Sequence, residues 1–309
     1  MNETLRARLK QRLQEPGLVV APGVFDMVSL RLADSFGFDA LYMTGYGTVA
    51  SHMGLPDAGL ATYSDMVGRV TAMAGMAKTP LIADADTGYG GLLNMRHTIQ
   101  GYEAAGAAAI QLEDQEFPKK CGHTPGRRVI PMEDMVRKIQ VAVDSRTDPN
   151  FLIIARTDAR TTLGLDEALR RAEAYARAGA DILFVESPES EEEMRRIGQS
   201  FDLPLLANMV EKGRTPVLSR QELESIGYKL AIFPVTALLA AARANPTELS
   251  YGTAGIGSTH HLAGELLASM SKTKLLHVPF RGDSASLTGT PFRVTLMRVM
   301  SEPRMRKLV

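Results

Sequence analysis

The chain has 309 residues, of which 45% are hydrophobic, and its 35 basic and 35 acidic side chains give a formal net charge of +0. This hydrophobic content can bury a large core and excludes an intrinsically disordered protein. The balanced charge lacks the basic surplus that nucleic acids or anionic membranes attract, so we expect neither as a partner. The single cysteine, Cys121, excludes an intramolecular disulfide and disfavours a thiolate metal cluster.

The first element in chain order is an expected N-terminal helix. Residues 1–14 are charged and amphipathic and contain no apolar h-region or cleavage site, so we expect no secretory signal. No apolar run reaches the roughly 18 residues that a transmembrane helix needs. Together with the lone cysteine, these features favour a cytoplasmic protein.

Short apolar runs then alternate with longer helical patterns between residues 18 and 244. The runs that we predict as strands are 18–21, 40–43, 80–83, 108–112, 151–155, 182–185, 203–207 and 230–232. Segments such as 134–143 and 166–177 carry apolar residues at helical spacing. This alternation predicts βα units around a parallel sheet, and about eight units close a (β/α)8 TIM-type barrel. An open doubly wound sheet is the alternative, but no Gly-x-Gly-x-x-Gly follows the first strand.

A weak internal repeat supports repeated βα units. Residues 103–113 echo residues 175–186, because each segment has a helix that ends near a glycine, then a buried run, then a glutamate. The glycines, Gly106 and Gly179, suit the left-handed position at a helix C-terminus.

Polar side chains follow most of the predicted strands, and in a parallel barrel these strand ends share the face where active sites form. Asp84 and Asp86 end the third strand and Glu113 ends the fourth, so we expect their oxygens to converge. Carboxylates placed that close repel one another unless a cation is present. Hard oxygen ligands at an open site suit Mg²⁺, with Mn²⁺ as the other choice.

Three other polar residues lie at strand ends, and two of them have competing interpretations. Asp158 and Ser187 are either site residues or ordinary N-caps of the helices that follow. Arg156 comes directly after a buried run, where a guanidinium needs an anion, so it is predicted to bind a carboxylate.

The proline and glycine content of residues 117–128 predicts a loop. Cys121 lies there beside Lys119, Lys120 and His123, whose positive charge favours the thiolate and makes the cysteine a candidate acid or base. A solvated basic loop with an incidental thiol is the alternative. The loop could also form a lid over substrate.

Eight short motifs together resemble the isocitrate lyase/phosphoenolpyruvate mutase superfamily, in particular its 2,3-dimethylmalate lyase, petal death protein and methylisocitrate lyase branch. The resemblance covers about residues 6–244. The motifs are Pro22-Gly-Val-Phe-Asp26, Gly54-Leu-Pro-Asp-Ala-Gly59, Asp84-Ala-Asp86, Gln111-Leu-Glu-Asp-Gln115, Lys119-Lys-Cys-Gly-His123, Arg156-Thr-Asp158, Val185-Glu-Ser187 and Ala207-Asn-Met-Val-Glu211.

The resemblance implies roles for particular residues and an assembly. Mg²⁺ would be held by Asp84, with Asp57, Asp86 and Glu113 around it. The substrate carboxylates would meet the following residues: Thr44, Gly45, Tyr46, Gly122, Arg156 and Asn208. The catalytic group would comprise Cys121 as proton donor with Lys119, His123, Arg156, Glu186 and Tyr42. The expected assembly is a homo-oligomer, a tetramer with exchanged C-terminal helices or a dimer.

The implied activity is cleavage of a carbon–carbon bond in a 2-hydroxy di- or tricarboxylate, of the 2-alkylmalate or methylisocitrate type, to pyruvate or another 2-oxo acid plus a carboxylic acid. The Lys-x-Cys-Gly-His pattern favours a lyase over a phosphonate mutase. Val210 stands where methylisocitrate enzymes tend to carry a hydroxyl, which favours a 2-alkylmalate or oxaloacetate as substrate. The alternatives are an oxaloacetate hydrolase or decarboxylase, a phosphoenolpyruvate phosphonomutase, and a carboxylate-binding protein that is not an enzyme.

The sequence changes character after the barrel. Residues 249–286 resemble a fragment of a tripartite tricarboxylate receptor, a solute-binding protein. About 65 residues of a two-lobed protein cannot supply a core of their own. We therefore predict a catalytic barrel domain over residues 1–245 and an atypical, fusion-derived tail over residues 246–309.

Overall fold

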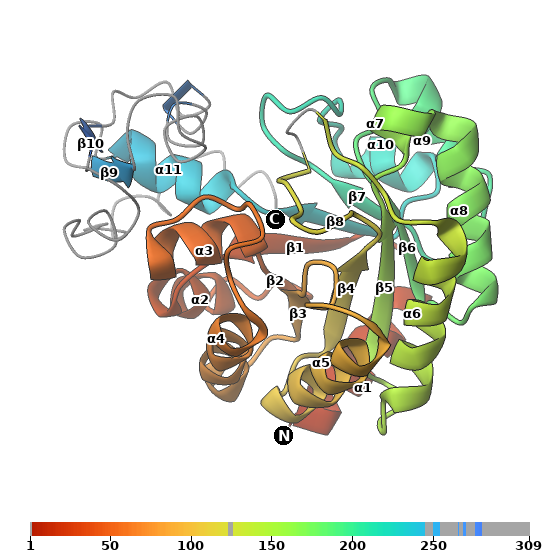
Figure 1. Cartoon of the computed structure of the whole chain (residues 1–309), viewed down its shortest axis with the longest axis horizontal. Helices are drawn as coiled ribbons and strands as arrows, with labels where there is room; N and C mark the ends of the chain where they lie inside the picture. The colour runs from red at the N-terminus through yellow and green to blue at the C-terminus, as the bar shows by residue number, and fades with distance from the viewer. Residues whose placement is uncertain are drawn as a thin grey trace.

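The computed structural model describes residues 2–122 and 126–244, together with residues 250–253, 265, 268–269 and 276–279. Eight parallel strands form its central sheet in the order β6-β5-β4-β3-β2-β1-β8-β7 (Figure 1). A parallel bridge between Leu183 of β6 and Leu205, next to β7, joins the two outer strands of this order. The strands thus form a nearly closed barrel, and the predicted (β/α)8 fold is confirmed. The strands are β1 (Val19–Val24), β2 (Leu41–Met43), β3 (Leu81–Asp84), β4 (Ala109–Glu113), β5 (Leu152–Thr157), β6 (Ile182–Val185), β7 (Leu206–Asn208) and β8 (Leu230–Phe233).

Helices connect the strands and cover the outside of the barrel (Figure 1). They are α1 (Asn2–Gln14), α2 (Met27–Asp34), α3 (Gly45–Met53), α4 (Tyr63–Met76), α5 (Leu92–Ala105), α6 (Met132–Ser145), α7 (Arg160–Leu163), α8 (Leu165–Arg177), α9 (Glu191–Gly198), α10 (Arg220–Ser225) and α11 (Thr236–Ala244). The helix α5 ends at Gly106, whose φ of 99° is left-handed as expected, and Gly179 has the same conformation with φ of 102°.

Each predicted strand overlaps an observed one, and the largest differences at the ends are in the first and seventh strands. The first strand continues past the expected Ala21 to Val24, because Gly23 and Val24 pair with β2. The seventh starts at Leu206 rather than at residue 203, since Pro204 has no N–H to give to a β-ladder.

The barrel interior is filled by side chains from alternating strand positions, among them Tyr42, Ile154 and Phe184. Leu9 and Leu13 of α1 belong to the same cluster, so the predicted N-terminal helix closes the end of the barrel where the strands begin. A larger apolar layer lies between the strands and the outer helices.

Two short parallel strands, β9 (Ser250–Thr253) and β10 (Leu276–Pro279), pair with each other in a separate sheet. Most of the predicted tail, residues 246–309, lies outside the described residues, and the domain boundary at residue 245 stays a prediction. None of the helices in the described part of the chain has the length and apolar character needed to span a membrane.

Candidate active site

A cavity that is partly open to solvent lies at the carboxyl ends of the strands. Most residues predicted to bind substrate line it, together with several that were not predicted. The lining residues are Tyr42, Thr44, Tyr46, Asp57, Asp84, Cys121, Gly122, Arg156, Phe184, Glu186, Asn208, Val210, Ile232, Pro234, Val235 and Leu239. Gly45, Asp86, Glu113 and Lys119 lie just behind this wall, and His123 lies outside the described residues.

The first part of the site is a group of buried carboxylates around Lys119. The Lys119 ammonium is ion-paired with Asp57 and, at 2.6 Å, with Asp86. Asp84 lies beside this pair, where its carboxylate accepts hydrogen bonds from the backbone N–H groups of Gly45 and Asp86, at 3.3 and 3.1 Å. The sequence placed Lys119 with the catalytic groups of the loop, whereas the structure places its charge among the predicted metal ligands.

The protonation of these groups follows from burial. Burial raises the pKa of Asp86 to about 7, with Asp57 and Asp84 adding to the effect against the opposing charge of Lys119. Burial also raises the pKa of Glu113 well above its usual range, although Arg156 opposes it. Burial disfavours the Lys119 ammonium, but the Asp57 and Asp86 carboxylates outweigh this and hold its pKa well above the usual value. Lys119 is therefore a fixed positive charge.

The donor set fits a hydrated divalent cation. Oxygen atoms from carboxylates are the ligands that Mg²⁺ prefers, and Oε1 of the buried Glu113 has no hydrogen-bond partner among the described residues. Within that same part of the chain, no three His, Cys, Asp or Glu side chains form a complete ligand cluster by themselves.

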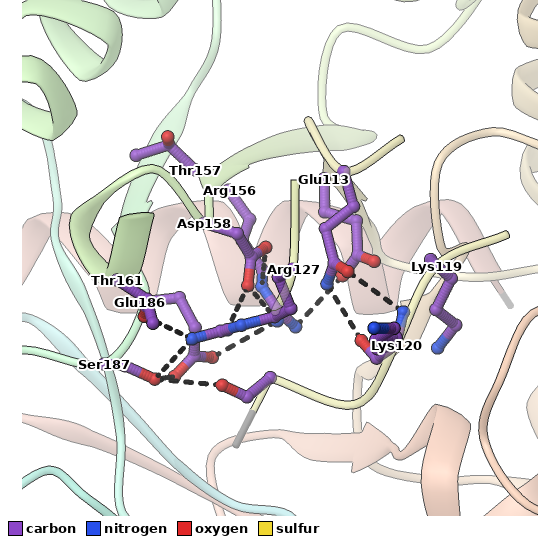
Figure 2. A network of polar contacts seen from close by, with 12 residues as sticks. Glu113, Lys119, Lys120, Arg127, Arg156, Thr157, Asp158, Thr161, Glu186 and Ser187 are labelled. Carbon is purple, nitrogen blue, oxygen red and sulfur yellow. Dashed lines mark hydrogen bonds and ion pairs between the residues drawn. The ribbon is translucent and has the colours of Figure 1, made fainter. Parts of the chain in front are cut away.

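The second part of the site is a buried network centred on Arg156 (Figure 2). Its Nε and Nη2 donate to the two oxygens of Asp158, both at 2.9 Å, and its Nη1 lies 3.1 Å from Glu113. Nη2 is also 3.6 Å from Glu186, and the guanidinium lies 5.3 Å from the ring centre of Phe184. The anions predicted for Arg156 are thus supplied in part by the protein, which fixes the guanidinium at the cavity wall.

The third part is the loop that carries Cys121. Its start is held by the Gln115 side chain, which donates to the backbone oxygen of Lys120 at 2.9 Å and accepts from the N–H of the same residue at 3.0 Å. Gly122 packs onto the pocket so tightly that a Cβ there would lie 2.6 Å from Arg156 Nη2. The half-buried Cys121 therefore faces the same cavity as Arg156 and Asp84.

The remaining predicted polar groups approach the cavity from neighbouring strands. Asn208 Nδ2 donates to Glu186 Oε2 at 3.0 Å, while its Oδ1 is buried without a partner among the described residues. Thr44 caps α3, whose N-terminal turn therefore begins at the cavity edge, a favourable place for a carboxylate. Tyr42 donates to Gln111 Oε1 at 3.1 Å, and burial raises the pKa of its phenol well above the usual value.

The capping interpretation of Asp158 and Ser187 is not supported, because the N-caps of α7 and α9 are Ala159 and Ser190. Asp158 instead pairs with Arg156 and with Arg127, whose side chain is fully buried. Ser187 Oγ lies against the Cys121 loop, 3.0 Å from the backbone oxygen of Gly122.

Comparison with known proteins gives the family. The family model described as phosphoenolpyruvate phosphomutase matches residues 9–249. The 2,3-dimethylmalate lyase of Eubacterium barkeri is 53% identical over 238 residues, which cover 77% of this chain and 82% of that protein. The 2-methylisocitrate lyase of Aeropyrum pernix is 44% identical over 241 residues, covering 78% and 77% of the two chains. This chain belongs to the phosphoenolpyruvate mutase/isocitrate lyase superfamily. Its high-identity relatives are lyases, and it is a carbon–carbon lyase of this superfamily.

Solved structures of the superfamily superimpose on the barrel. The crystal structure of 2,3-dimethylmalate lyase matches with a TM-score of 0.74 at 41% identity, covering 79% of this chain and 81% of that one. Oxaloacetate acetylhydrolase with 3,3-difluorooxalacetate matches with a TM-score of 0.74 at 32% identity, covering 87% and 93%. Phosphonopyruvate hydrolase, in a complex with oxalate and Mg²⁺, matches with a TM-score of 0.68 at 31% identity, covering 79% and 83%.

A second family model, the tripartite tricarboxylate transporter family receptor, matches residues 229–300. Its first part overlaps β8 and α11, which belong to the barrel, and α11 supplies Leu239 to the cavity. The first part of this second match is therefore a segment of the barrel itself.

Sequence reasoning missed an apolar wall in this superfamily site. It consists of Phe184, Val210, Ile232, Pro234, Val235 and Leu239. The alternation of inward-facing positions could have pointed to Phe184 and Ile232, but both look like ordinary strand residues. Only Val210 was singled out from the sequence, and it lies in this wall.

Proposed function

We propose that this chain is a Mg²⁺-dependent lyase that cleaves a 2-alkylmalate, a 2-hydroxy dicarboxylate, into a 2-oxo acid and a carboxylic acid. The observation that carries the proposal is the position of Cys121 in one cavity with Asp84, Arg156 and an apolar wall. A thiol that can donate a proton, a predicted metal-binding carboxylate and a carboxylate-binding cation thus surround a space that can also take an alkyl group. The name of one high-identity relative, 2,3-dimethylmalate lyase, agrees with this substrate class, whereas other relatives are named 2-methylisocitrate lyases.

The two ends of the substrate are recognised by different groups. Arg156 and Asn208 would bind a carboxylate, because Arg156 is a fixed cation and the Asn208 Nδ2 group has a second N–H besides the one that it donates to Glu186. The N-terminal turn of α3 would meet the other carboxylate through the backbone of Thr44, Gly45 and Tyr46.

The alkyl substituents would lie against the apolar wall. Val210 and Leu239 offer no hydrogen-bond donor there, so a third carboxylate would be buried without a partner. This favours a 2-alkylmalate over methylisocitrate.

The bond cleavage needs a base and an acid. The base takes the proton of the 2-hydroxyl, the C2–C3 bond breaks to leave a 2-oxo acid, and the electron pair goes to C3 beside the carboxylate. Cys121 then gives its thiol proton to C3, which completes the carboxylic acid. Mg²⁺, held by Asp84 with Asp57, Asp86 and Glu113 around it, would supply electrostatic stabilisation of charge on the substrate oxygens.

Two candidates for the base differ in their surroundings. The raised pKa of Tyr42 keeps it a neutral phenol that donates to Gln111, which disfavours it as a proton acceptor. Glu186 lies in the cavity and accepts from Asn208, so a water held by Glu186 is the better candidate. Lys119 acts in this scheme through its fixed charge beside Asp57 and Asp86, and His123 keeps its predicted role on the same loop.

The test is a coupled assay for 2-oxo acid release with 2-methylmalate, 2,3-dimethylmalate, methylisocitrate and oxaloacetate, with a parallel assay for oxalate. We expect pyruvate from a 2-alkylmalate, no turnover in EDTA, and a loss of about 10²- to 10⁴-fold in kcat for Cys121→Ser. Oxalate released from oxaloacetate would instead assign the chain to hydrolysis of that acid, the activity named for one structural neighbour.

A matched control is Ser51→Ala, on α3, which removes a hydroxyl bonded to the Phe25 backbone and lies outside the cavity lining. It should keep the wild-type kcat. The homo-oligomer, tetramer or dimer, and the cytoplasmic location stay predictions from the sequence. Size-exclusion chromatography with light scattering measures the first.

A further inference from the structure

Ser187 connects the cysteine loop to the floor of the cavity. It lies two residues after the end of β6, is fully buried, and has a left-handed φ of 59°. Its Oγ lies 3.0 Å from the backbone oxygen of Gly122 and 3.0 Å from Oε1 of Glu186 (Figure 2). A hydroxyl has a single hydrogen, so Ser187 can donate to only one of these acceptors at a time.

Arg127 limits which acceptors are open to the Ser187 hydroxyl hydrogen. Its guanidinium pairs with Asp158, donates to Thr161, and reaches Ser187 Oγ at 3.4 Å (Figure 2). A guanidinium can only donate hydrogen bonds, so Ser187 Oγ must accept from Arg127. The hydroxyl hydrogen is therefore left for Gly122 or Glu186. Gly122 and Arg127 flank the loop on either side of residues 123–125, and both contact Ser187.

The contact of Gly122 with the cavity is close. A Cβ at this position would lie 2.6 Å from Nη2 of Arg156 and 3.1 Å from Oε2 of Glu186. Arg156 cannot easily move away, because Asp158 and Glu113 hold its guanidinium. The distance between the Gly122 backbone and these two side chains therefore depends on what holds the Gly122 carbonyl, which is Ser187.

We infer that Ser187, oriented by Arg127, is a positioning residue of the lyase that fixes the Gly122 carbonyl. It thereby holds the neighbouring Cys121 thiol in the cavity that Arg156 and Glu186 line. This inference rests on the proposed function in one respect, the role of Cys121 as proton donor. The placement of the loop itself is independent of the reaction.

Two variants remove the hydroxyl in different backbone contexts. Ser187→Ala keeps the strained φ, whereas Ser187→Gly relieves it, because glycine adopts φ of 59° without cost. Because the Gly122 carbonyl then loses its hydrogen bond, kcat should fall by about 3- to 10-fold in both variants. KM for the dicarboxylate should stay within about twofold of wild type, because Arg156 and Asn208 are untouched.

A second readout uses the single cysteine of the chain, since iodoacetamide labelling then reports on Cys121 alone. Alkylation rates measured from pH 6 to 10 separate the thiol's access, given by the plateau at high pH, from its pKa. We expect the plateau rate to rise by about 3- to 10-fold in Ser187→Ala and Ser187→Gly, because the loop is no longer held at Gly122.

Ser190→Ala is the matched control. Ser190 caps α9 three positions along the same connection, and its Oγ accepts from the N–H of Glu193 at 3.1 Å. This variant should lower the melting temperature without changing kcat or the alkylation plateau.

The outcomes separate the two ideas. Wild-type kcat and alkylation in both Ser187 variants would overturn the positioning role, and so would a change in Ser187→Ala that Ser187→Gly reverses, since this would assign the effect to backbone strain. Absence of turnover by the wild-type protein on every acid tested would overturn the proposed function alone. The alkylation plateau would still decide whether Ser187 holds the loop.

Discussion

Two buried ionic networks lie at opposite ends of the barrel, and they differ in how completely their atoms are paired. At the end where the strands begin, Arg6 of α1 donates to the backbone oxygens of Ala107 and Glu103 and pairs with Asp148 at 3.2 Å. The Glu103 carboxylate in turn accepts from the backbone N–H groups of Thr147 and Asp148. Each charged group there meets a fixed partner from the protein.

The network at the carboxyl ends of the strands is left incomplete. Glu113 Oε1, Arg127 Nε and Asn208 Oδ1 are buried without partners among the described residues. Burial also raises the pKa values of Asp86 and Glu113 there, against the opposing charges of Lys119 and Arg156. The same residue types thus build a structural clamp at one end and a site that requires a ligand at the other.

The largest expected effect tests the incomplete end. Asp84→Asn removes the central predicted metal carboxylate while keeping its size, so we expect kcat/KM to fall by about 10³-fold. The rise in melting temperature that Mg²⁺ gives the wild-type protein should disappear as well, which calorimetry with and without Mg²⁺ measures.

Asp134→Asn is the matched control for Asp84→Asn. Asp134 lies on the exposed surface of α6, where it pairs with Arg137 at 3.6 Å. It should keep both the activity and the thermal response to Mg²⁺. A Mg²⁺ response that survives in Asp84→Asn would contradict the assignment of this carboxylate.

A smaller effect, on stability instead of activity, is expected at the other end. Arg6→Met leaves Asp148 and two backbone oxygens without their donor, so the free energy of unfolding should fall by about 3 kcal/mol. The folded fraction should keep the wild-type kcat, because α1 is on the opposite side of the barrel from the cavity. Urea denaturation and the lyase assay measure the two quantities.

Glu113→Gln sharpens the same comparison. The raised pKa of Glu113 means that its charged form is disfavoured in the folded protein, so a neutral amide of the same shape should change the unfolding free energy in EDTA by less than about 1 kcal/mol. A loss as large as that of Arg6→Met would show that the two networks are equally structural, and the contrast between the ends would fail.

The smallest expected effect on activity concerns the apolar wall. Val210→Ser supplies a hydroxyl donor in a cavity side that has none, so the ratio of kcat/KM for methylisocitrate to that for 2,3-dimethylmalate should rise by about tenfold. Val210→Ala, which also shrinks the side chain but adds no donor, should leave this ratio within about twofold. Equal changes in both variants would assign the selectivity to volume alone.

Local patterns predicted the barrel well, because each strand is a short apolar run and two helices end at glycines with left-handed φ. Position after a buried run also singled out Asp84 and Arg156, which line the cavity. These signals are local, because they depend only on the spacing of apolar residues along the sequence and on the free-energy cost of burying a charge.

Pairings between distant residues could not be predicted in this way. The sequence gives no indication that Lys119 meets Asp57, or that Arg127 reaches Asp158 and Ser187, since these contacts depend on how a long loop folds back. The apolar wall was missed for a different reason. Phe184 and Leu239 have the composition of core residues, and only the geometry of the cavity shows that they face open space.

The clamp at Arg6 also has a consequence for synthesis on the ribosome. Its partner Asp148 lies 142 positions further along the chain, and Lys10 of the same helix bonds the backbone oxygen of Pro149. At about 5–20 residues per second, the ribosome needs roughly 7–28 s to make this stretch. During that time Leu9 and Leu13 lack the barrel interior that later covers them. Helix α1 must therefore wait until Asp148 and Pro149 have been made before it can form these contacts.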